Sequence, residues 1–159
     1  MVMTMPSTIT IICSMCATKT LCMTKLYHDH GYPEILGSLD DEITYINEIK
    51  NPRASASKTG IYSADTILVP LEDGDRAEIL SKSGKNIITI DLNPLSRTSK
   101  MSDVSIVDNV VRAIPFMTKI AGDLKSQDEK LLKELIEDFD NDANLKESLE
   151  LFKIKEDIK

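Results

Sequence analysis

Three clusters of polar residues near the middle of the chain carry side chains that could bind a nucleotide. They are Glu72-Asp73-Gly74-Asp75-Arg76, the stretch from Asp91 to Thr98, and Asp108-Asn109. Asp91 is placed to accept hydrogen bonds from ribose hydroxyls. Arg97, helped by the hydroxyls of Ser96 and Thr98, offers donors to phosphate oxygens. The acids of the first cluster could hold magnesium through water, and a helix beginning near Asn109 would offer an anion site.

Each cluster follows a short apolar run, and these runs are the strands expected to position it. The runs are Thr66–Leu71, Asn86–Ile90 and Val104–Val107. Uninterrupted apolar strands are typical of a parallel sheet covered on both faces. Because the carboxyl ends of parallel strands lie at one edge of the sheet, we expect the three clusters to meet there.

The segments between and after these strands predict helices. A helix from Asp75 to Ser83 is ended by Gly84, and a polar loop follows the second strand from Asp91 to Asp103. Asp108 is predicted to be the N-cap of a long helix that continues to Lys125, with a possible kink at Pro115. This order predicts an α/β domain with parallel pairing.

The flanking regions are less regular. A short helix is predicted at Leu26–His30, followed by a loop and a polar extended region up to residue 59. The segment Asn51–Ser55 reads equally well as a surface loop near the site or as a linker. In the tail, apolar residues recur at helical spacing, which favours amphipathic helices used for core packing or a dimer contact; they are Leu131, Leu132, Leu135, Ile136, Phe139, Leu145, Leu149 and Phe152.

Composition limits the other classes of function. The chain has 159 residues and a net charge of −7, which argues against binding to a nucleic-acid backbone. No run approaches the ~18 apolar residues that a membrane span needs. The three cysteines are all near the N-terminus, at Cys13, Cys16 and Cys22. An odd, clustered set does not suggest a disulfide framework and fits a reducing, cytoplasmic setting.

A zinc site built from these cysteines with His28 and His30 is a minor alternative, because the spacing lacks two separated ligand pairs.

The residues assigned to a nucleotide site also have an ordinary structural explanation. No Gly-x-Gly-x-x-Gly or Walker lysine loop is present, Asp108 is commonly just a helix cap, and Asp73-Gly74 is commonly just a turn. The residue pattern alone therefore indicates an α/β ligand-binding domain.

The segments GIYSADTILVPLEDGDRAE, IDLNPLSRTSKMSD and SIVDNVVRAIP resemble the archaeal phosphopantothenate synthetase family, the 4-phosphopantoate–β-alanine ligases. The resemblance runs from about Leu26 to the end and includes FDNDANLKESL in the tail. It implies a cytoplasmic, homodimeric, Rossmann-like enzyme of coenzyme A biosynthesis, with a parallel sheet flanked by helices. Such an enzyme would use ATP and Mg²⁺ to activate 4-phosphopantoate, which β-alanine would then attack.

The resemblance also implies site residues in this sequence. Asp91 would suit the ribose, Asn93 the adenosine side, and Arg97 with Thr98 the phosphates. The full set of implied ATP contacts is Asp91, Leu92, Asn93, Arg97, Thr98, Asn109 and Val110. Candidates near the reacting groups are Asp73, Asp75 and Arg76.

Members of that family carry a further N-terminal portion ahead of the matching segment. We therefore expect an N-terminally truncated ligase, with residues 26–159 forming a single α/β nucleotide-binding domain. Residues 1–25 are rich in Met, Thr, Ser and Cys without clear periodicity, and we interpret them as disordered or out-of-frame. The alternative function is a truncated, non-catalytic nucleotide-binding paralogue or dimer partner.

Overall fold

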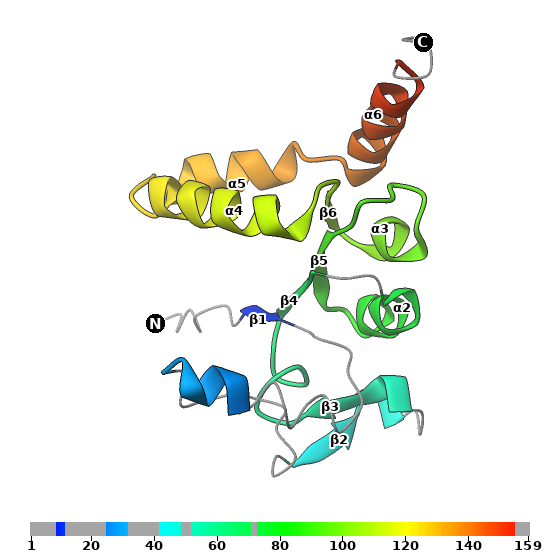
Figure 1. Cartoon of the computed structure of the whole chain (residues 1–159), viewed down its shortest axis with the longest axis vertical. Coiled ribbons are helices and arrows are strands. Elements are labelled where there is room, and N and C mark those ends of the chain that lie inside the picture. The colour runs from blue at the N-terminus through cyan, green and yellow to red at the C-terminus, as the bar shows by residue number, and fades with distance from the viewer. Residues whose placement is uncertain (1–8, 12–24, 32–41, 49–51, 71–72, 155–159) are drawn as a thin grey trace.

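The computed structural model describes residues 9–11, 25–31, 42–48, 52–70 and 73–154. Its centre is a four-stranded sheet of β1 (Ile9–Ile11), β4 (Thr66–Val69), β5 (Asn86–Ile90) and β6 (Val104–Ile106). The strand order is β1-β4-β5-β6, and every neighbouring pair is parallel. The predicted parallel α/β fold is confirmed (Figure 1).

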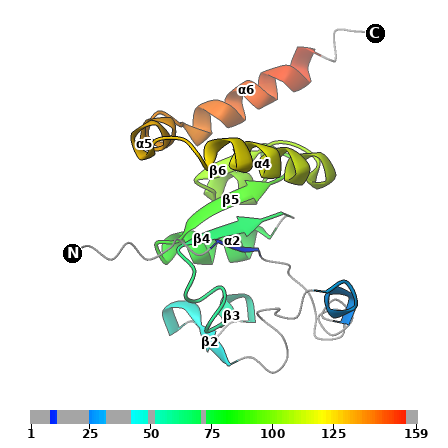
Figure 2. The ribbon, with the colours of Figure 1, turned by 90° about the vertical axis from the view of Figure 1, so that its left-hand side faces the viewer.

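Helices cover both faces of the sheet. Helix α2 (Gly74–Lys82) and helix α3 (Arg97–Met101) lie on one side, and α4 (Val110–Leu124) lies on the other (Figures 1 and 2). Successive residues of β4 point to opposite faces: Ile67 packs with Leu80 of α2, and Leu68 packs with Ala113 of α4. Burial on both faces explains why the strands are apolar without interruption.

Local sequence explains the end of helix α2 and the start of helix α4. Helix α2 is followed by Gly84, whose φ of +81° suits glycine, so the predicted stop is confirmed. Helix α4 runs unbroken through Pro115. Its N-cap is Asn109 and not the predicted Asp108: the Asn109 side chain accepts a hydrogen bond from the Val111 N–H at 2.8 Å. The Asp108 carboxylate instead accepts from the Arg112 Nε–H at 2.9 Å.

Helix α3 lies within the stretch that was predicted to be a loop. Ser96 is its N-cap, and the Ser96 hydroxyl oxygen accepts from the Ser99 N–H at 3.0 Å. The helix has only five residues, too few to produce a recognisable periodicity. Its existence depends on the cap and on tertiary contacts.

Two further strand pairings were not predicted. Strand β1 lies within residues 1–25 and pairs with β4, with Ile9 opposite Thr66. Strand β2 (Ile43–Tyr45) and β3 (Ser55–Ser57) form an antiparallel pair in the region predicted as polar and extended. Two short 3-10 turns lie between them, η1 (Ile46–Glu48) and η2 (Pro52–Ala54). Strands of three residues are fixed by their partners, so sequence periodicity does not reveal them.

The tail forms the two predicted helices, α5 (Glu129–Glu137) and α6 (Asn141–Ile154). Leu145 of α6 is buried, whereas α5 has no buried residue. The short helix predicted near Leu26 is present at residues 25–29. None of the helices in the described ranges has the length and apolar character needed to span a membrane.

Candidate nucleotide-binding site

The carboxyl ends of β4, β5 and β6 lie at one edge of the sheet, because the three strands are parallel neighbours. Helices α2, α3 and α4 begin at this edge. The predicted site residues therefore fall into three groups, one after each strand: Asp73, Asp75 and Arg76; Asp91, Leu92, Asn93, Arg97 and Thr98; and Asn109 and Val110. The described residues of the three clusters thus follow the carboxyl ends of neighbouring parallel strands.

The loop after β5 is held in shape by its own polar side chains. The Asp91 carboxylate accepts from the Asn93 N–H at 2.9 Å and from the Ser96 hydroxyl at 2.5 Å. The side-chain oxygen of Asn93 accepts from the Leu95 N–H at 2.9 Å. Such Asx-type turns fix a loop without regular structure. Leu92 and Leu95 are 64% and 55% exposed, so an apolar surface adjoins these polar groups.

A row of buried hydroxyl side chains lies beneath this loop. The Ser99 hydroxyl donates to the Asn93 carbonyl oxygen at 3.1 Å, and the Ser105 hydroxyl donates to the Ser99 carbonyl oxygen at 2.9 Å. Thr98 is fully buried, and its hydroxyl has no hydrogen-bond partner among the described residues. A ligand can therefore reach the Thr98 hydroxyl only if the loop or α3 shifts.

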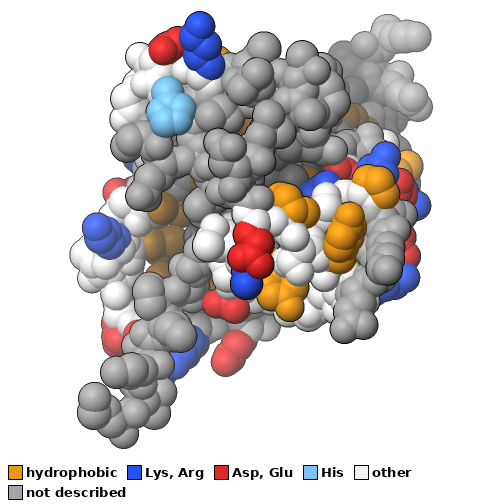
Figure 3. All heavy atoms as spheres, turned by 90° about the horizontal axis from the view of Figure 1, so that it is seen from below, with side chains coloured by type: hydrophobic (Ala, Val, Ile, Leu, Met, Phe, Trp, Pro, Cys, Tyr) orange, Lys and Arg blue, Asp and Glu red, His pale blue; other side chains and the backbone are white. Residues whose placement is uncertain are grey.

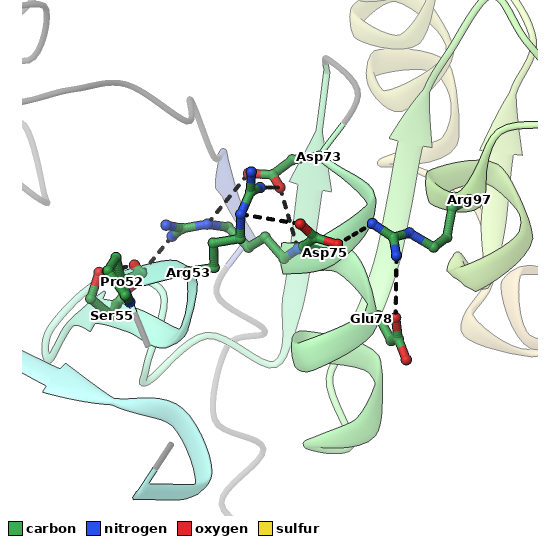
Figure 4. A network of polar contacts seen from close by, with 8 residues as sticks. Pro52, Arg53, Ser55, Asp73, Asp75, Glu78 and Arg97 are labelled. Atoms are coloured by element: carbon green, nitrogen blue, oxygen red, sulfur yellow. Dashed lines mark hydrogen bonds and ion pairs between the residues drawn. The ribbon is translucent and has the colours of Figure 1, made fainter. Parts of the chain in front are cut away.

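Arg97 reaches from α3 to the start of α2. Its guanidinium contacts the carboxylate of Asp75, and its Nη1 lies 4.0 Å from Oε2 of Glu78 (Figure 4). Gly74 makes this close approach possible, because a Cβ added there would lie 2.8 Å from Nε of Arg97. The side chain of Arg97 remains 54% exposed, so an anion can reach it from solvent.

Polar contacts connect the β2–β3 hairpin to the start of α2. They involve Arg53, Asp73 and Arg76. Nη1 of Arg53 donates to Oδ1 of Asp73 at 2.7 Å, and Nη1 of Arg76 donates to the Ser55 carbonyl oxygen at 3.2 Å. Nε of Arg76 lies 3.6 Å from Oδ2 of Asp73. That distance allows charge attraction but not a hydrogen bond, and neither atom has a hydrogen-bond partner in the described part of the chain.

This cluster of charged side chains is buried at one end and exposed at the other. Burial lowers the pKa of the Arg76 guanidinium, and the nearby Asp73 carboxylate offsets part of that effect. The side chains of Asp73 and Arg76 are only 5% and 15% exposed, whereas that of Asp75 is 43% exposed. In this structure, then, Asp73 and Arg76 hold the hairpin against α2, and Asp75 links Arg53 with Arg97 at the surface.

The described carboxylates do not form a metal site. Asp73 and Asp75 are both engaged by arginines, and no group of three possible metal ligands occurs in the described ranges. Glu72 lies outside the described residues, as do the three cysteines of the zinc alternative. His30 places its Nδ1 at 2.8 Å from the Leu26 carbonyl oxygen, at the end of the helix over residues 25–29.

Two groups of residues at this edge were not selected from the sequence. Arg53 was missed because its segment read equally well as a linker. Ser96 was selected as a hydroxyl donor beside Arg97, but Ser99, Ser102 and Ser105 were missed because single serines are common in loops; the usable signal was the spacing of three from Ser96 onward. All four are buried.

Among the described residues, the face at the β2–β3 end carries side chains of both charges (Figure 3). Seen from that side, acidic and basic side chains lie near one another with hydrophobic side chains between them (Figure 3). Ile43 and Tyr45 are the large exposed hydrophobic residues of β2.

The fold and the site define the class of protein: a Rossmann-like α/β protein with polar residues gathered at the carboxyl edge of a parallel sheet. Residues 15–155 match the sequence profile of the phosphopantothenate/pantothenate synthetase family. The chain belongs to this family. The match begins inside the segment 1–25 that the sequence analysis set apart.

Individual curated proteins of this family are also similar to the chain. The 4-phosphopantoate–β-alanine ligase of Methanosarcina mazei is 48% identical over 119 residues, which is 75% of this chain and 46% of that protein. The ligase of the same name from Thermococcus onnurineus is 48% identical over 101 residues, covering 64% and 39%. That of Methanospirillum hungatei is 42% identical over 104 residues, covering 65% and 41%. The chain thus spans less than half the length of these relatives.

Proposed function

We propose that this chain carries the nucleotide-binding part of a cytoplasmic, ATP-dependent ligase that joins 4-phosphopantoate to β-alanine. The products would be 4′-phosphopantothenate, AMP and diphosphate, a step of coenzyme A biosynthesis. Family membership and the names of the relatives support the reaction. The observation that carries the proposal is the gathering of Asp91–Asn93, Arg97 and Asn109 at one sheet edge in a chain of this family.

The proposed chemistry has two steps. The carboxylate of 4-phosphopantoate attacks the α-phosphorus of ATP, and diphosphate leaves, so that an acyl-adenylate forms. The amine of β-alanine then attacks the acyl carbon; AMP leaves with the electron pair of the broken C–O bond, and the amine proton passes to solvent. Both steps gain from groups that balance charge on the phosphates.

The residues of the edge suit different parts of ATP. Asp91 is proposed to accept from the ribose hydroxyls and Asn93 to contact the adenosine side, next to the exposed Leu92. Arg97 would leave Asp75 to bind phosphate oxygens, which its exposed guanidinium can do. Thr98 would join it after a local shift, and the start of α4 at Asn109 and Val110 would complete the site.

The first cluster is proposed to act near the reacting groups, through Asp73, Asp75 and Arg76. Its observed ion pairs favour positioning over direct reaction, because Asp73 and Arg76 are largely buried. Mg²⁺ would enter with ATP as its complex. The described residues contain no group of three possible metal ligands.

The same chain would act as a homodimer, through apolar side chains that α4 and α5 leave exposed. A non-catalytic nucleotide-binding paralogue or dimer partner is the second candidate.

Two measurements test these proposals. The first is calorimetric titration of Mg·ATP into the wild type and into Arg97→Ala. A charge-assisted hydrogen bond is worth about 1.5–3 kcal/mol, so the variant should bind at least about ten-fold more weakly. Lys130→Ala is the control, because Lys130 is an exposed residue of α5 that pairs with Glu134 on the same helix and has no contact with the Arg97 cluster. Equal affinity in Arg97→Ala and the wild type would exclude both candidates as described.

The second measurement separates the two candidates. AMP release is followed with ATP, 4-phosphopantoate and β-alanine together, and with each acid omitted in turn. A ligase releases AMP only when both acids are present. A folded chain that binds ATP but releases no AMP under any of these conditions supports the non-catalytic candidate.

A further inference from the structure

Two asparagines at the start of α6 complete the outer edge of β6. Within the described sheet β6 is the last strand, so backbone groups on its outer side have no neighbouring strand. The Ser105 N–H donates to Oδ1 of Asn141 at 2.8 Å, and Nδ2 of Asn144 donates to the Ser105 carbonyl oxygen at 2.8 Å. Residues three apart lie on one face of a helix. The pair therefore satisfies both backbone groups of Ser105.

Asn141 makes a second set of contacts that Asn144 does not share. Its Nδ2 donates to the carbonyl oxygens of Ser99 at 3.2 Å and Ser102 at 2.9 Å. The Ser99 carbonyl lies in the last turn of α3 and also accepts from the Ser102 N–H and the Ser105 hydroxyl, whereas the Ser102 carbonyl lies just after the helix. One amide side chain thus holds the end of α3 and the edge of β6 together.

Capping of α6 does not account for Asn141. The side chain of Asp140 accepts from the Ala143 N–H at 3.0 Å, and the Asp140 carbonyl oxygen accepts from the Asn144 N–H at 3.1 Å. Asp140 therefore has the position of an N-cap. Asn141 comes one residue later, and its three side-chain hydrogen bonds all go to residues outside α6.

The contact at Ser99 connects Asn141 to the candidate nucleotide loop. Ser99 shares its carbonyl oxygen with Asn141 and with the Ser105 hydroxyl, while its own hydroxyl donates to the Asn93 carbonyl oxygen. Ser96, two residues from Thr98, donates to Asp91. Because α3 has five residues and helices this short are not stable alone, its position depends on these contacts at its two ends.

We propose that Asn141 is a positioning residue of the nucleotide site: it fixes α3, and through α3 the place of Arg97 and the loop from Asp91 to Asn93. The inference rests on the proposed function for its effect on ATP, but its effect on α3 is a property of the fold. Small displacements of binding groups can cost up to about a hundred-fold in function. The C-terminal helix would then be part of the nucleotide site although it does not contact the nucleotide.

Asn141→Asp is the sharpest variant. It keeps the acceptor for the Ser105 N–H, but it replaces the donor with a carboxylate oxygen that faces the Ser99 and Ser102 carbonyls. We expect the amides of Ser99, Lys100 and Ser102 to exchange hydrogen at least about ten-fold faster, and Mg·ATP to bind about ten-fold more weakly. Hydrogen exchange, calorimetric titration and the unfolding midpoint are measured on the same samples.

Asn144→Ala is the matched control, because it removes a hydrogen bond to β6 without a contact to α3. It should leave α3 exchange and ATP affinity near wild type when the variants are compared at equal distance below their unfolding midpoints. Unchanged α3 exchange in Asn141→Asp overturns the inference, as does an equal effect in Asn144→Ala. A wild type that binds no ATP overturns the proposed function, while the exchange measurement still decides the role of Asn141.

Discussion

The position of the Arg97 side chain requires a residue without a side chain at position 74. Gly74 has no positive φ, so backbone strain does not explain a glycine there. Space does: the Arg97 side chain lies across the first residue of α2, with its Cβ 3.1 Å from where a Gly74 Cβ would be. The position of the proposed phosphate ligand thus depends on the start of a different helix.

Gly74→Ala should therefore displace Arg97 and weaken Mg·ATP binding, by roughly the same factor as removing the guanidinium. Gly122→Ala is the matched control, since a Cβ there meets nothing within 4 Å and alanine favours α4 by about 0.5–1 kcal/mol. Thermal unfolding and calorimetric titration measure both effects. An unchanged ATP affinity in Gly74→Ala would show that phosphate binding does not depend on the position of Arg97 beside residue 74.

Asp108 provides a test of local electrostatics at the end of β6. A hydrogen bond from Arg112, and then one from the Asn109 N–H, hold the pKa of the Asp108 carboxyl below its ordinary value. Because the folded pKa is depressed, the stabilising contact is present above the ordinary pKa and is lost as the pH falls through the folded pKa.

We expect Arg112→Gln to raise the pKa of Asp108 back toward its ordinary value, measured by carbon-13 NMR titration of the carboxyl. The backbone hydrogen bond from Asn109 remains in that variant, so the return should be incomplete. Lys119→Gln, an exposed change on the same helix, should leave the titration as in the wild type. An identical Asp108 titration in Arg112→Gln would mean that the ion pair does not form in solution.

At the scale of elements, the start of α2 depends on the buried carboxylate of Asp73. Asp73 is the N-cap of α2, and its carboxylate accepts from the Arg76 N–H at 3.3 Å. Burial lowers the pKa of Arg76, and the Asp73 carboxylate acts against this by raising it. Removing the acid would leave a buried guanidinium without its counter-charge.

Asp73→Ala should destabilise the fold by about 3–5 kcal/mol, the usual effect of breaking a buried ion pair. The double variant Asp73→Ala/Arg76→Met should recover part of this loss, because methionine fills the space without a charge. Denaturant unfolding monitored by circular dichroism gives both values. A double variant less stable than Asp73→Ala would show that Arg76 stabilises the fold independently of Asp73.

Some helices and strands could be predicted from the sequence, and others could not. Strands β4 and β5 and helix α2 were predicted because their apolar runs and stop signals are local, such as Gly84. Helix α3 and strand β1 were not, because each is short and depends on partners distant in sequence. In the site, the clusters after each strand were predicted, whereas Arg53 and Asn141 were not. Their contacts join segments about 20 and 40 residues apart, and no local pattern encodes such pairs.

On the scale of the whole molecule, the two faces of the sheet differ in how far the chain covers them. The α2 side has a compact core in which Ile67, Val69, Leu80 and Ile87 are buried. On the other side, α4 buries Ala113 but exposes Val111 and Phe116 by 77% and 63%. Helix α5 is apolar along one stripe and has no buried residue. Exposed apolar surface on this scale is typical of an interface, and a second copy of the chain is the occupant that the proposed homodimer supplies.

The substitution Ile136→Lys tests this interface, because Ile136 is the most exposed hydrophobic residue of α5, at 74%. The wild type should sediment as a dimer and the variant as a monomer, since a buried lysine without a partner opposes association. The variant's circular dichroism should not change, because the residue has few contacts to lose within its own chain. Tyr62→Lys is the control: Tyr62 is 48% exposed but lies in the turn before β4, away from α4 and α5. A wild type that sediments as a monomer would contradict the proposed homodimer. An Ile136→Lys variant that remains a dimer would show that the dimer contact lies elsewhere.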